Sequence, residues 1–310
     1  MYRGMMHTRC DDTETVFYFS PSDFPALISE SYRFKSSEGN TLQGYIYNYA
    51  DPIPQRLVVF DHGFGGGHRA YMKEIDMLCK HGFTVFAYDH TGCMESGGKS
   101  PGGLAHSLCD LNDCINVIKA DRRFEGFDIS VMGHSWGAFS TLNITALHPQ
   151  ISHIVAMCGF VSVEEMTKTF FSGILKVYRK AIMKLETETN PEFVKYNAVK
   201  TLSKSSVKAL LIYSADDPMC RSVHYDILKE GLEKKENIRF ILCENKGHNP
   251  NYTTDAVKRL DDFSKKRAAI AKMSGVTAKE KARFVASFDW NAMTEQDDAI
   301  WQEIFAHLDN

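Results

Sequence analysis

The sequence predicts an α/β fold in which a mostly parallel sheet is covered by helices on both faces. Short, nearly continuous apolar segments alternate along the chain with segments of helical periodicity, and strands that lack a polar face are buried on both sides. The chain has 310 residues, of which 44% are hydrophobic and 24% charged. This length suits one large domain with insertions or two small domains.

The individual strands and helices follow from this pattern in chain order. Residues 31–36 and 41–49 are expected to form two strands joined by a turn at Glu38-Gly39-Asn40. Buried strands are then expected at 56–60, 83–88, 129–132, 151–158, 207–213 and 238–243, and helices at about 71–80, 105–120, 138–147, 221–234 and 300–308. Because parallel strands connect by right-handed crossovers, functional loops should meet at the carboxyl edge of the sheet.

The segment Gly133-His134-Ser135-Trp136-Gly137 has the G-x-S-x-G pattern of a nucleophile elbow. An apolar strand is predicted before it and a helix after it, as this sharp turn requires. The two glycines lack side chains that would collide across the turn. The helix N-terminus points at the serine and favours the negative charge that develops when it attacks a carbonyl. Ser135 is therefore the predicted nucleophile.

A serine nucleophile needs a general base and an acid that orients the base. Among twelve histidines, His248 follows the last predicted strand of the sheet, and Asp217 follows the strand before it. Both loops should reach the edge that carries Ser135. Asp216 is the rival for the acid, and the Pro218 that follows Asp217 favours Asp217.

Two backbone amides are predicted to bind the oxyanion of the tetrahedral intermediate. The first is the N–H of Trp136, next to the nucleophile, and the second is the N–H of Phe64 in the glycine-rich loop 62–67. A loop of this kind could instead hold a phosphate, but it lacks the G-K-[ST] ending of a phosphate-binding loop.

No metal or other cofactor is expected. His62, His68 and His90 cluster in the sequence, but there is no H-E-x-x-H motif and no C-x-x-C pair. His62 is expected to stabilise its own loop by hydrogen bonding. Cys93 could act as a thiol nucleophile near the edge of the site, and an ordinary loop cysteine is the favoured interpretation.

The bulk composition excludes several classes of partner. A net charge of −3 gives no general surface for nucleic acid or anionic membrane, and no apolar run is long enough to span a bilayer. The first 20 residues carry Asp11, Asp12 and Glu14 and lack the apolar core of a secretory signal. Eight cysteines without such a signal indicate reduced thiols and a cytoplasmic location.

The alternation of strand and helix stops between residues 161 and 206. Apolar residues recur there at helical spacing: Met166, Phe170, Phe171, Ile174, Val177, Tyr178, Ala181, Ile182 and Leu185. This stripe either buries a helix against its own domain or forms a cap over a pocket, and we favour the cap. Phe170, Phe171 and Tyr178, together with Phe160, are then the expected substrate-binding residues.

These motifs together resemble the α/β-hydrolase superfamily. The residues that carry the resemblance span about 31–250: His62-Gly63-Phe64-Gly65, Asp89 with Gly92 and Ser96-Gly97, the elbow, Asp217-Pro218 and Gly247-His248. The chain is most similar to cytoplasmic bacterial esterases, monoacylglycerol-lipase-like hydrolases and the serine aminopeptidase-like branch. The resemblance implies an eight-stranded sheet, a helical lid after the sixth strand and a Ser–His–Asp triad. The core would comprise 1–160 and 207–310, and the cap 161–206.

Two features depart from the superfamily pattern. Cys93-Met94 replace the small or basic residue and glycine of many relatives, so this loop should shape its pocket differently. Residues 255–291, in which Thr277-Ala-Lys-Glu280 is a helix-capping pattern, intervene before an amphipathic final helix. This helical insert either covers the pocket or makes a subunit contact in a homo-oligomer.

The expected function is hydrolysis of a small carboxylic ester with an apolar acyl or aryl group, through an acyl-enzyme. An aminopeptidase or amidase is the alternative enzyme, with Glu164 or Glu165 binding the free amine of the substrate. A ligand-binding protein that uses the same fold without catalysis is a third reading, because a fold does not determine a function.

Overall fold

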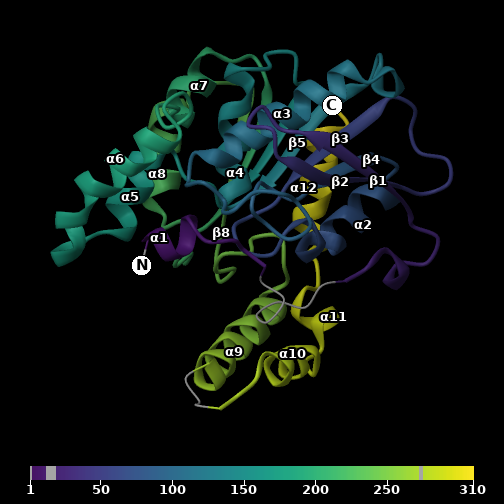
Figure 1. The fold of residues 1–310 in the computed structure, drawn as a ribbon. Coiled ribbons are helices and arrows are strands. Elements are labelled where there is room, and N and C mark those ends of the chain that lie inside the picture. Colours follow the sequence, from purple (N-terminus) through teal and green to yellow (C-terminus); the bar gives the residue numbers. More distant parts are fainter. Residues whose placement is uncertain (1, 12–18, 272–274) are drawn as a thin grey trace.

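The computed structural model describes residues 2–11, 19–271 and 275–310, and its central feature is an eight-stranded sheet (Figure 1). The strand order is β1-β2-β4-β3-β5-β6-β7-β8. Only β1 and β2 run against their neighbours, and the remaining pairs are parallel. The strands are β1 (Ile28–Lys35), β2 (Thr41–Asn48), β3 (Arg56–Asp61), β4 (Thr84–Tyr88), β5 (Asp128–His134), β6 (His153–Met157), β7 (Lys208–Ser214) and β8 (Ile238–Cys243). The predicted α/β fold and the eight-stranded sheet are confirmed.

The predicted hairpin at the start of the sheet is also present. Lys35 of β1 lies opposite Thr41 of β2. Gly39 in the connecting turn has φ 84°, in the left-handed region that glycine tolerates without a steric penalty.

Helices cover both faces of the sheet and form a separate apolar core on each. Adjacent strand residues such as Val58 and Val59 point into opposite cores. The cluster around Val59 includes α3, α4 and α8, and the cluster around Val58 includes α2 and α12. The helices are α1 (Tyr2–Met6), α2 (Met72–Lys80), α3 (His106–Ala120), α4 (Trp136–Asn143), α5 (Val163–Phe170), α6 (Arg179–Thr189), α7 (Ala198–Lys204), α8 (Val223–Leu232), α9 (Thr254–Ala271), α10 (Ala278–Ala286), α11 (Trp290–Met293) and α12 (Asp298–Leu308). Short 3₁₀ turns lie at Pro21–Asp23, His68–Tyr71, Arg122–Phe124, Ile144–Ala146 and Gly173–Tyr178.

Residues 161–206 are helical, but the predicted continuous apolar stripe is interrupted. The chain leaves α5, turns at Gly173 with φ 57° and forms a 3₁₀ turn before α6 begins. Because a 3₁₀ turn has three residues per turn, it shifts the register of the side chains that follow. Ile174 is consequently 88% exposed and Tyr178 56% exposed. The stripe therefore does not form one buried face.

Helix α6 is fixed to the body by one buried carboxylate. Glu186 accepts hydrogen bonds from the Tyr2 hydroxyl of α1, from the Leu104 amide at 2.8 Å and from the Ala105 amide at 3.2 Å. Asn190, which follows α6, donates to the Gly102 carbonyl at 2.9 Å. The N-terminal helix and α6 therefore hold the loop that leads into α3, and they lie side by side in Figure 1.

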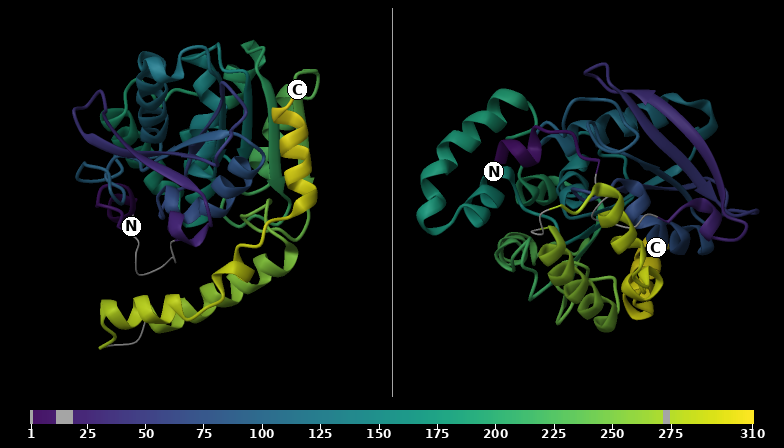
Figure 2. Two further views of the ribbon diagram at one scale, coloured as in Figure 1. Left: turned by 90° about the vertical axis from the view of Figure 1, so that its right-hand side faces the viewer. Right: turned by 60° about the horizontal axis from the view of Figure 1, so that its bottom comes forward.

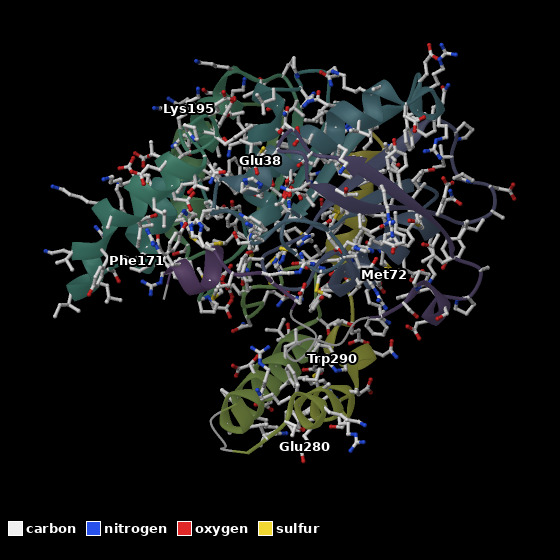
Figure 3. The ribbon with its side chains drawn as sticks, viewed as in Figure 1. Glu38, Met72, Phe171, Lys195, Glu280 and Trp290 are labelled. Carbon is white, nitrogen blue, oxygen red and sulfur yellow. The ribbon has the colours of Figure 1, made fainter. Side chains whose placement is uncertain are left out.

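The expected helical insert forms a second addition to the sheet, which we call the tail arm and define as α9, α10 and α11. Figure 2 shows α9 and α10 as a long helical pair along one end of the body. The predicted capping box is present, since Thr277 and Glu280 bond each other's backbone amides. Trp290 lies at the base of the tail arm and Glu280 near its outer end (Figure 3). In the described part of the chain, no helix combines the length and apolar character needed to cross a membrane.

Candidate active site

Ser135 lies at the sharp turn between β5 and α4, in a strained backbone conformation with φ 56° and ψ −112°. The flanking glycines are required by close approach of the backbone. A Cβ on Gly133 would lie 2.5 Å from the carbonyl oxygen of Gly137, and a Cβ on Gly137 would overlap with the carbonyl oxygen of Asp61. Local packing therefore fixes the turn and presents the serine side chain, which is partly exposed.

His248 connects Ser135 to Asp217 by two hydrogen bonds. Its Nε2 lies 2.8 Å from the Ser135 hydroxyl, and its Nδ1 lies 2.7 Å from Asp217 Oδ2. A carboxylate only accepts, so Nδ1 carries the proton and Nε2 is free to accept from the serine. The three residues follow β5, β7 and β8, and the carboxyl ends of these parallel strands bring them together.

Asp216, the rival for the orienting acid, has a different set of partners. Its carboxylate accepts from the Ser214 hydroxyl at 2.7 Å, from the Lys246 amide at 3.1 Å and from the Gly247 amide at 3.2 Å. It therefore braces the loop that precedes His248. The geometry pairs the histidine ring with Asp217.

The surroundings of Asp217 hold its carboxylate in the charged form. Burial by itself would raise the pKa of Asp217, but the hydrogen bond and charge of His248 and the bond from the Met219 amide outweigh burial, so the pKa is lowered. Cys158, at the end of β6 with φ 51°, adds a hydrogen bond from its buried thiol. Sequence reasoning missed this thiol, and its position directly after a buried strand was the available signal.

The two residues whose amides are predicted to bind an oxyanion, Phe64 and Trp136, contact each other through their side chains. Trp136 is the first residue of α4, so its N–H has no acceptor within the helix. The Phe64 ring packs edge-on against the Trp136 ring, with 5.6 Å between centroids. His62 Nδ1 donates to the Gly63 carbonyl at 2.7 Å, and His62 Nε2 accepts from the His90 amide at 3.0 Å. His62 thus has the predicted contacts of a residue that stabilises the loop.

The other histidines near this loop contact buried carboxylates. His90 contacts Asp61 at 2.7 Å and Asp110 at 3.2 Å. Burial opposes its charge, but the two carboxylates outweigh burial and raise the pKa of His90 to about 9. His68 contacts Asp89 at 2.8 Å. Among the described residues, the group with spacing suited to a shared metal ion is Cys158, Asp217 and His248, and these three already bond one another.

The predicted substrate-binding set does not form one pocket. Phe160 is 1% exposed and stacks on Phe139 at 4.5 Å in the core, so its ring is not accessible in this structure, and its part in substrate binding stays a prediction. Phe171 and Tyr178 line a groove of about 510 Å³ with Tyr2 of α1, and Ser135, Asp217 and His248 are not among its described lining residues. Figure 3 places Phe171 beside α1. Phe170 lies outside this lining.

One cavity lies next to the loop of His248 and another next to the loop 62–67, and both are bounded by the tail arm. A cavity of about 700 Å³ is lined by His248 together with Val257, Leu260 and Asp261 of α9. A second cavity, of about 220 Å³, is lined by Gly65, Tyr71, Phe263 and Trp290, and Leu260, Ser264 and Asn249 line both. Helix α9 therefore forms the wall beside His248.

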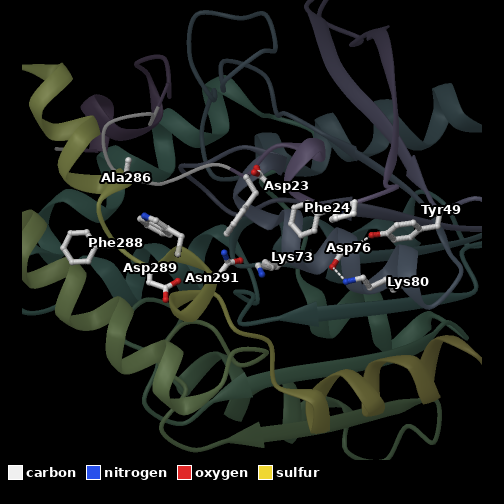
Figure 4. Close-up of a pocket in the computed structure, with 13 residues that line it drawn as sticks. Asp23, Phe24, Tyr49, Lys73, Asp76, Lys80, Ala286, Phe288, Asp289 and Asn291 are labelled. Carbon is white, nitrogen blue, oxygen red and sulfur yellow. Dashed lines mark hydrogen bonds and ion pairs between the residues drawn. The ribbon is translucent and has the colours of Figure 1, made fainter.

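A third cavity, of about 640 Å³, lies between α2 and the base of the tail arm (Figure 4). Lys73, Asp76 and Lys80 contribute from α2, and Asp289 and Asn291 contribute from the tail arm. Asp76 is already paired with Lys80 at 2.8 Å. None of the residues predicted to act in catalysis belongs to its described lining.

Two alternative catalytic groups have other surroundings. Cys93 is 1% exposed, and its hydrogen bond with Cys10 and its burial raise its pKa, so its thiol is neither accessible nor ionised. Glu164 and Glu165 both pair with Lys168 of their own helix, at 2.7 Å and 2.8 Å. Both carboxylates therefore pair with a lysine of the same helix, α5.

Comparison with known proteins identifies the family. The sequence profile of the family described as serine aminopeptidase, S33 matches residues 52–240, more than half of the chain. The chain belongs to the S33 serine aminopeptidase family. This family carries the α/β-hydrolase fold, so the resemblance to the α/β-hydrolase superfamily is confirmed.

Several of the solved structures and curated proteins that are similar to this S33 family member are hydrolases. The esterase Pf2001 of Pyrococcus furiosus superposes with a TM-score of 0.60 at 19% identity, covering 81% of this chain and 96% of that one. The α/β hydrolase GrgF of Penicillium sp. sh18 superposes with a TM-score of 0.54 at 17% identity, covering 77% and 98%. The thiohydrolase apmlB of Arthrinium phaeospermum is 26% identical over 134 residues, which are 42% of this chain and 43% of that protein. The chain spans about half the length of the curated relatives that it matches.

Proposed function

We propose that this hydrolase is a serine carboxylesterase that cleaves small esters with an apolar acyl or aryl group. The observation that carries the proposal is the hydrogen-bonded line from Asp217 through His248 to a serine in a strained turn. Such a line prepares a hydroxyl for attack on a carbonyl.

In the proposed reaction, the Ser135 hydroxyl oxygen attacks the ester carbonyl while His248 Nε2 takes its proton. Asp217 holds the ring and stabilises the imidazolium, and the Phe64 and Trp136 amides bind the oxyanion. When the intermediate collapses, His248 returns the proton to the departing alcohol and the acyl group stays on Ser135. Water then attacks the acyl-enzyme with His248 again as base, which regenerates the serine. Every proton transfer uses a side chain of this protein, so the proposal includes no cofactor.

An aminopeptidase of the same mechanism is the second candidate, because the matching family is described as serine aminopeptidase. Such an enzyme needs a carboxylate that receives the free amine of the substrate. Glu164 and Glu165 pair with Lys168 on their own helix, and neither is among the described lining residues of the cavity beside His248. This arrangement favours the esterase over the aminopeptidase.

A substrate panel with matched esters and amides tests both candidates. p-Nitrophenyl esters of increasing acyl length are compared with aminoacyl-p-nitroanilides of similar size, in the wild type and in Ser135→Ala. We expect ester turnover that Ser135→Ala abolishes, and covalent labelling of Ser135 by a fluorophosphonate. Preference for the anilide would replace the esterase with the aminopeptidase. No labelling of Ser135 would favour a ligand-binding protein.

A further inference from the structure

Partly buried Tyr71 and buried His134, which the proposed reaction does not use, connect the candidate base to loop 62–67, which we call the oxyanion loop. The Tyr71 hydroxyl, just before α2, accepts from the Gly63 amide at 3.1 Å and contacts His134 Nδ1 at 2.8 Å. His134, the residue before Ser135, contacts the backbone carbonyl of His248 through Nε2 at 2.7 Å. These bonds form an unbroken chain from Gly63 to His248.

The chemistry of each partner fixes the direction of these bonds. A carbonyl oxygen only accepts, so Nε2 of His134 carries a proton. Burial and the neighbouring charge of His248 lower the pKa of His134 to about 3, so the ring is neutral near pH 7 and Nδ1 accepts. The Tyr71 hydroxyl must then donate to Nδ1, which leaves its oxygen free to accept from Gly63. The titratable groups that face His134 are Tyr71, His248 and Asp217.

The hydrogen-bonded chain is closely packed where it passes Gly63. A Cβ on Gly63 would lie 2.5 Å from the Tyr71 hydroxyl and 3.3 Å from His134 Nδ1. The His134 and His248 rings are 4.7 Å apart, and the Tyr71 ring packs on Phe60 at 5.2 Å. Glycine at position 63 is therefore a condition for the Tyr71 contact.

The hydrogen bonds at Gly63 also determine the direction of the Phe64 N–H. Tyr71 holds the amide of Gly63, and His62 holds its carbonyl. The carbonyl of Gly63 and the amide of Phe64 share one planar trans peptide and point in opposite directions. Fixing Gly63 at both ends therefore aims the Phe64 N–H.

We propose that Tyr71 and His134 are positioning residues that hold the oxyanion loop in register with His248. The inference rests on the proposed function, because it treats the Phe64 amide as the oxyanion donor and His248 as the base. Neither side chain contacts the reacting atoms. Their effect is to keep the donor and the base at a fixed separation while charge develops between them.

The first test compares two tyrosines whose hydroxyls each contact a histidine. Tyr71→Phe removes the hydroxyl of the chain, and Tyr47→Phe removes a hydroxyl 2.9 Å from His68 Nε2, outside it. We expect Tyr71→Phe to lower kcat for a p-nitrophenyl ester about tenfold to a hundredfold, with KM changed less than about threefold. The Ki of an alkylboronic acid, which forms a tetrahedral adduct with the serine, should rise by the same factor as kcat/KM falls. Tyr47→Phe should leave both values unchanged.

These outcomes separate the inference from the proposed function. If Ser135→Ala abolishes turnover but Tyr71→Phe has the kcat and boronate Ki of the wild type, the positioning role is wrong and the esterase stands. If the wild type shows no turnover that depends on Ser135, the proposed function fails.

The second test requires no substrate. Nitrogen-15 spectra of the histidine side chains report which ring nitrogen carries the proton. We expect His134 to remain neutral with its proton on Nε2 between about pH 8 and pH 5. In Tyr71→Phe the Nδ1 resonance of His134 should move, because it loses its donor. A His134 that titrates near pH 6.5, or that carries its proton on Nδ1, would overturn the inference whatever the activity.

Discussion

The two helical additions to the sheet differ in sequence, and their surroundings are not those that their sequences suggest. Residues 161–206 carry the more prominent apolar stripe, yet Phe171 and Tyr178 line a groove against α1. The tail arm is largely polar along α9, yet Leu260 and Asp261 line the cavity that contains His248. Apolar periodicity therefore predicts helices here, and it does not show which part of the molecule they contact.

In the proposed function, the residues that carry out the reaction lie in the core, outside both helical additions. Asp217→Asn should lower kcat about ten-thousandfold, because the amide stabilises the wrong tautomer of His248. The matched change Asp216→Asn should cost less than about tenfold, since Asp216 bonds backbone amides of the loop. Ester turnover of both purified variants measures the difference. A larger loss in Asp216→Asn would exchange the roles of the two carboxylates.

The histidines that make the free energy of unfolding depend on pH also belong to the core, because neither 161–206 nor 255–291 contains a histidine. Burial first, then neighbouring histidine charge, lowers the pKa of His62 and His134 to about 3. Their unfolded forms bind a proton below about pH 6.5, so folding stability should fall by up to about 1.4 kcal/mol per pH unit for each as pH decreases toward 3.

His90 changes folding stability with pH in the opposite direction to His62 and His134. The Asp61 and Asp110 carboxylates raise its pKa to about 9 against the effect of burial. Its contribution is fully present below about pH 6.5 and is lost as pH rises through 9. Urea unfolding across this range should therefore show greatest stability near the middle. Stability that rises steadily toward pH 4 would contradict buried neutral His62 and His134.

Filling the cavity next to each helical addition with a larger side chain tests which addition affects substrate choice. Leu260→Trp should lower kcat/KM about tenfold to a hundredfold for long acyl esters relative to short ones, because α9 walls the cavity beside His248. Leu185→Trp fills the groove between α6 and α1 in the same way. It should leave the ratio of long to short esters unchanged. A shifted ratio in Leu185→Trp alone would return the substrate pocket to residues 161–206.

The smallest effect concerns how α6 is attached. Glu186→Gln weakens a buried acceptor of three hydrogen bonds and should reduce the free energy of unfolding by about 1–2 kcal/mol. Glu188→Gln, two residues further along the same helix and largely exposed, is the control and should change it by less than about 0.5 kcal/mol. Equal effects in the two variants would mean that the buried carboxylate does not anchor α6.

The sheet and the line of Ser135, His248 and Asp217 could be anticipated because their determinants are local. The glycines at 133 and 137 are demanded by backbone contacts within one turn, and parallel strands bring their following loops to one edge. Phe160 could not be placed, because an aromatic residue after a strand can face a pocket or stack in a core. Its stacking on Phe139 depends on how α4 docks.

The sequence could not predict that α9 forms the wall beside His248, and it could not predict the hydrogen bonds of Tyr71 and His134. Each depends on which residues distant along the chain become neighbours after folding. Tyr71 and Gly63 are eight residues apart, whereas His134 and the His248 carbonyl are 114 apart. Apolar periodicity contains no information on such pairs.

The tail arm leaves and re-enters the body at almost the same point. Tyr252 forms a β-bridge with Gln296, and the Thr253 amide donates to the Glu295 carbonyl at 2.9 Å. Lys246, in the loop before His248, bonds Asp297, which caps α12. A short linker could therefore join 253 to 295 without moving a strand. The segment between them is therefore a module whose length and sequence are independent of the strands that carry Ser135, Asp217 and His248.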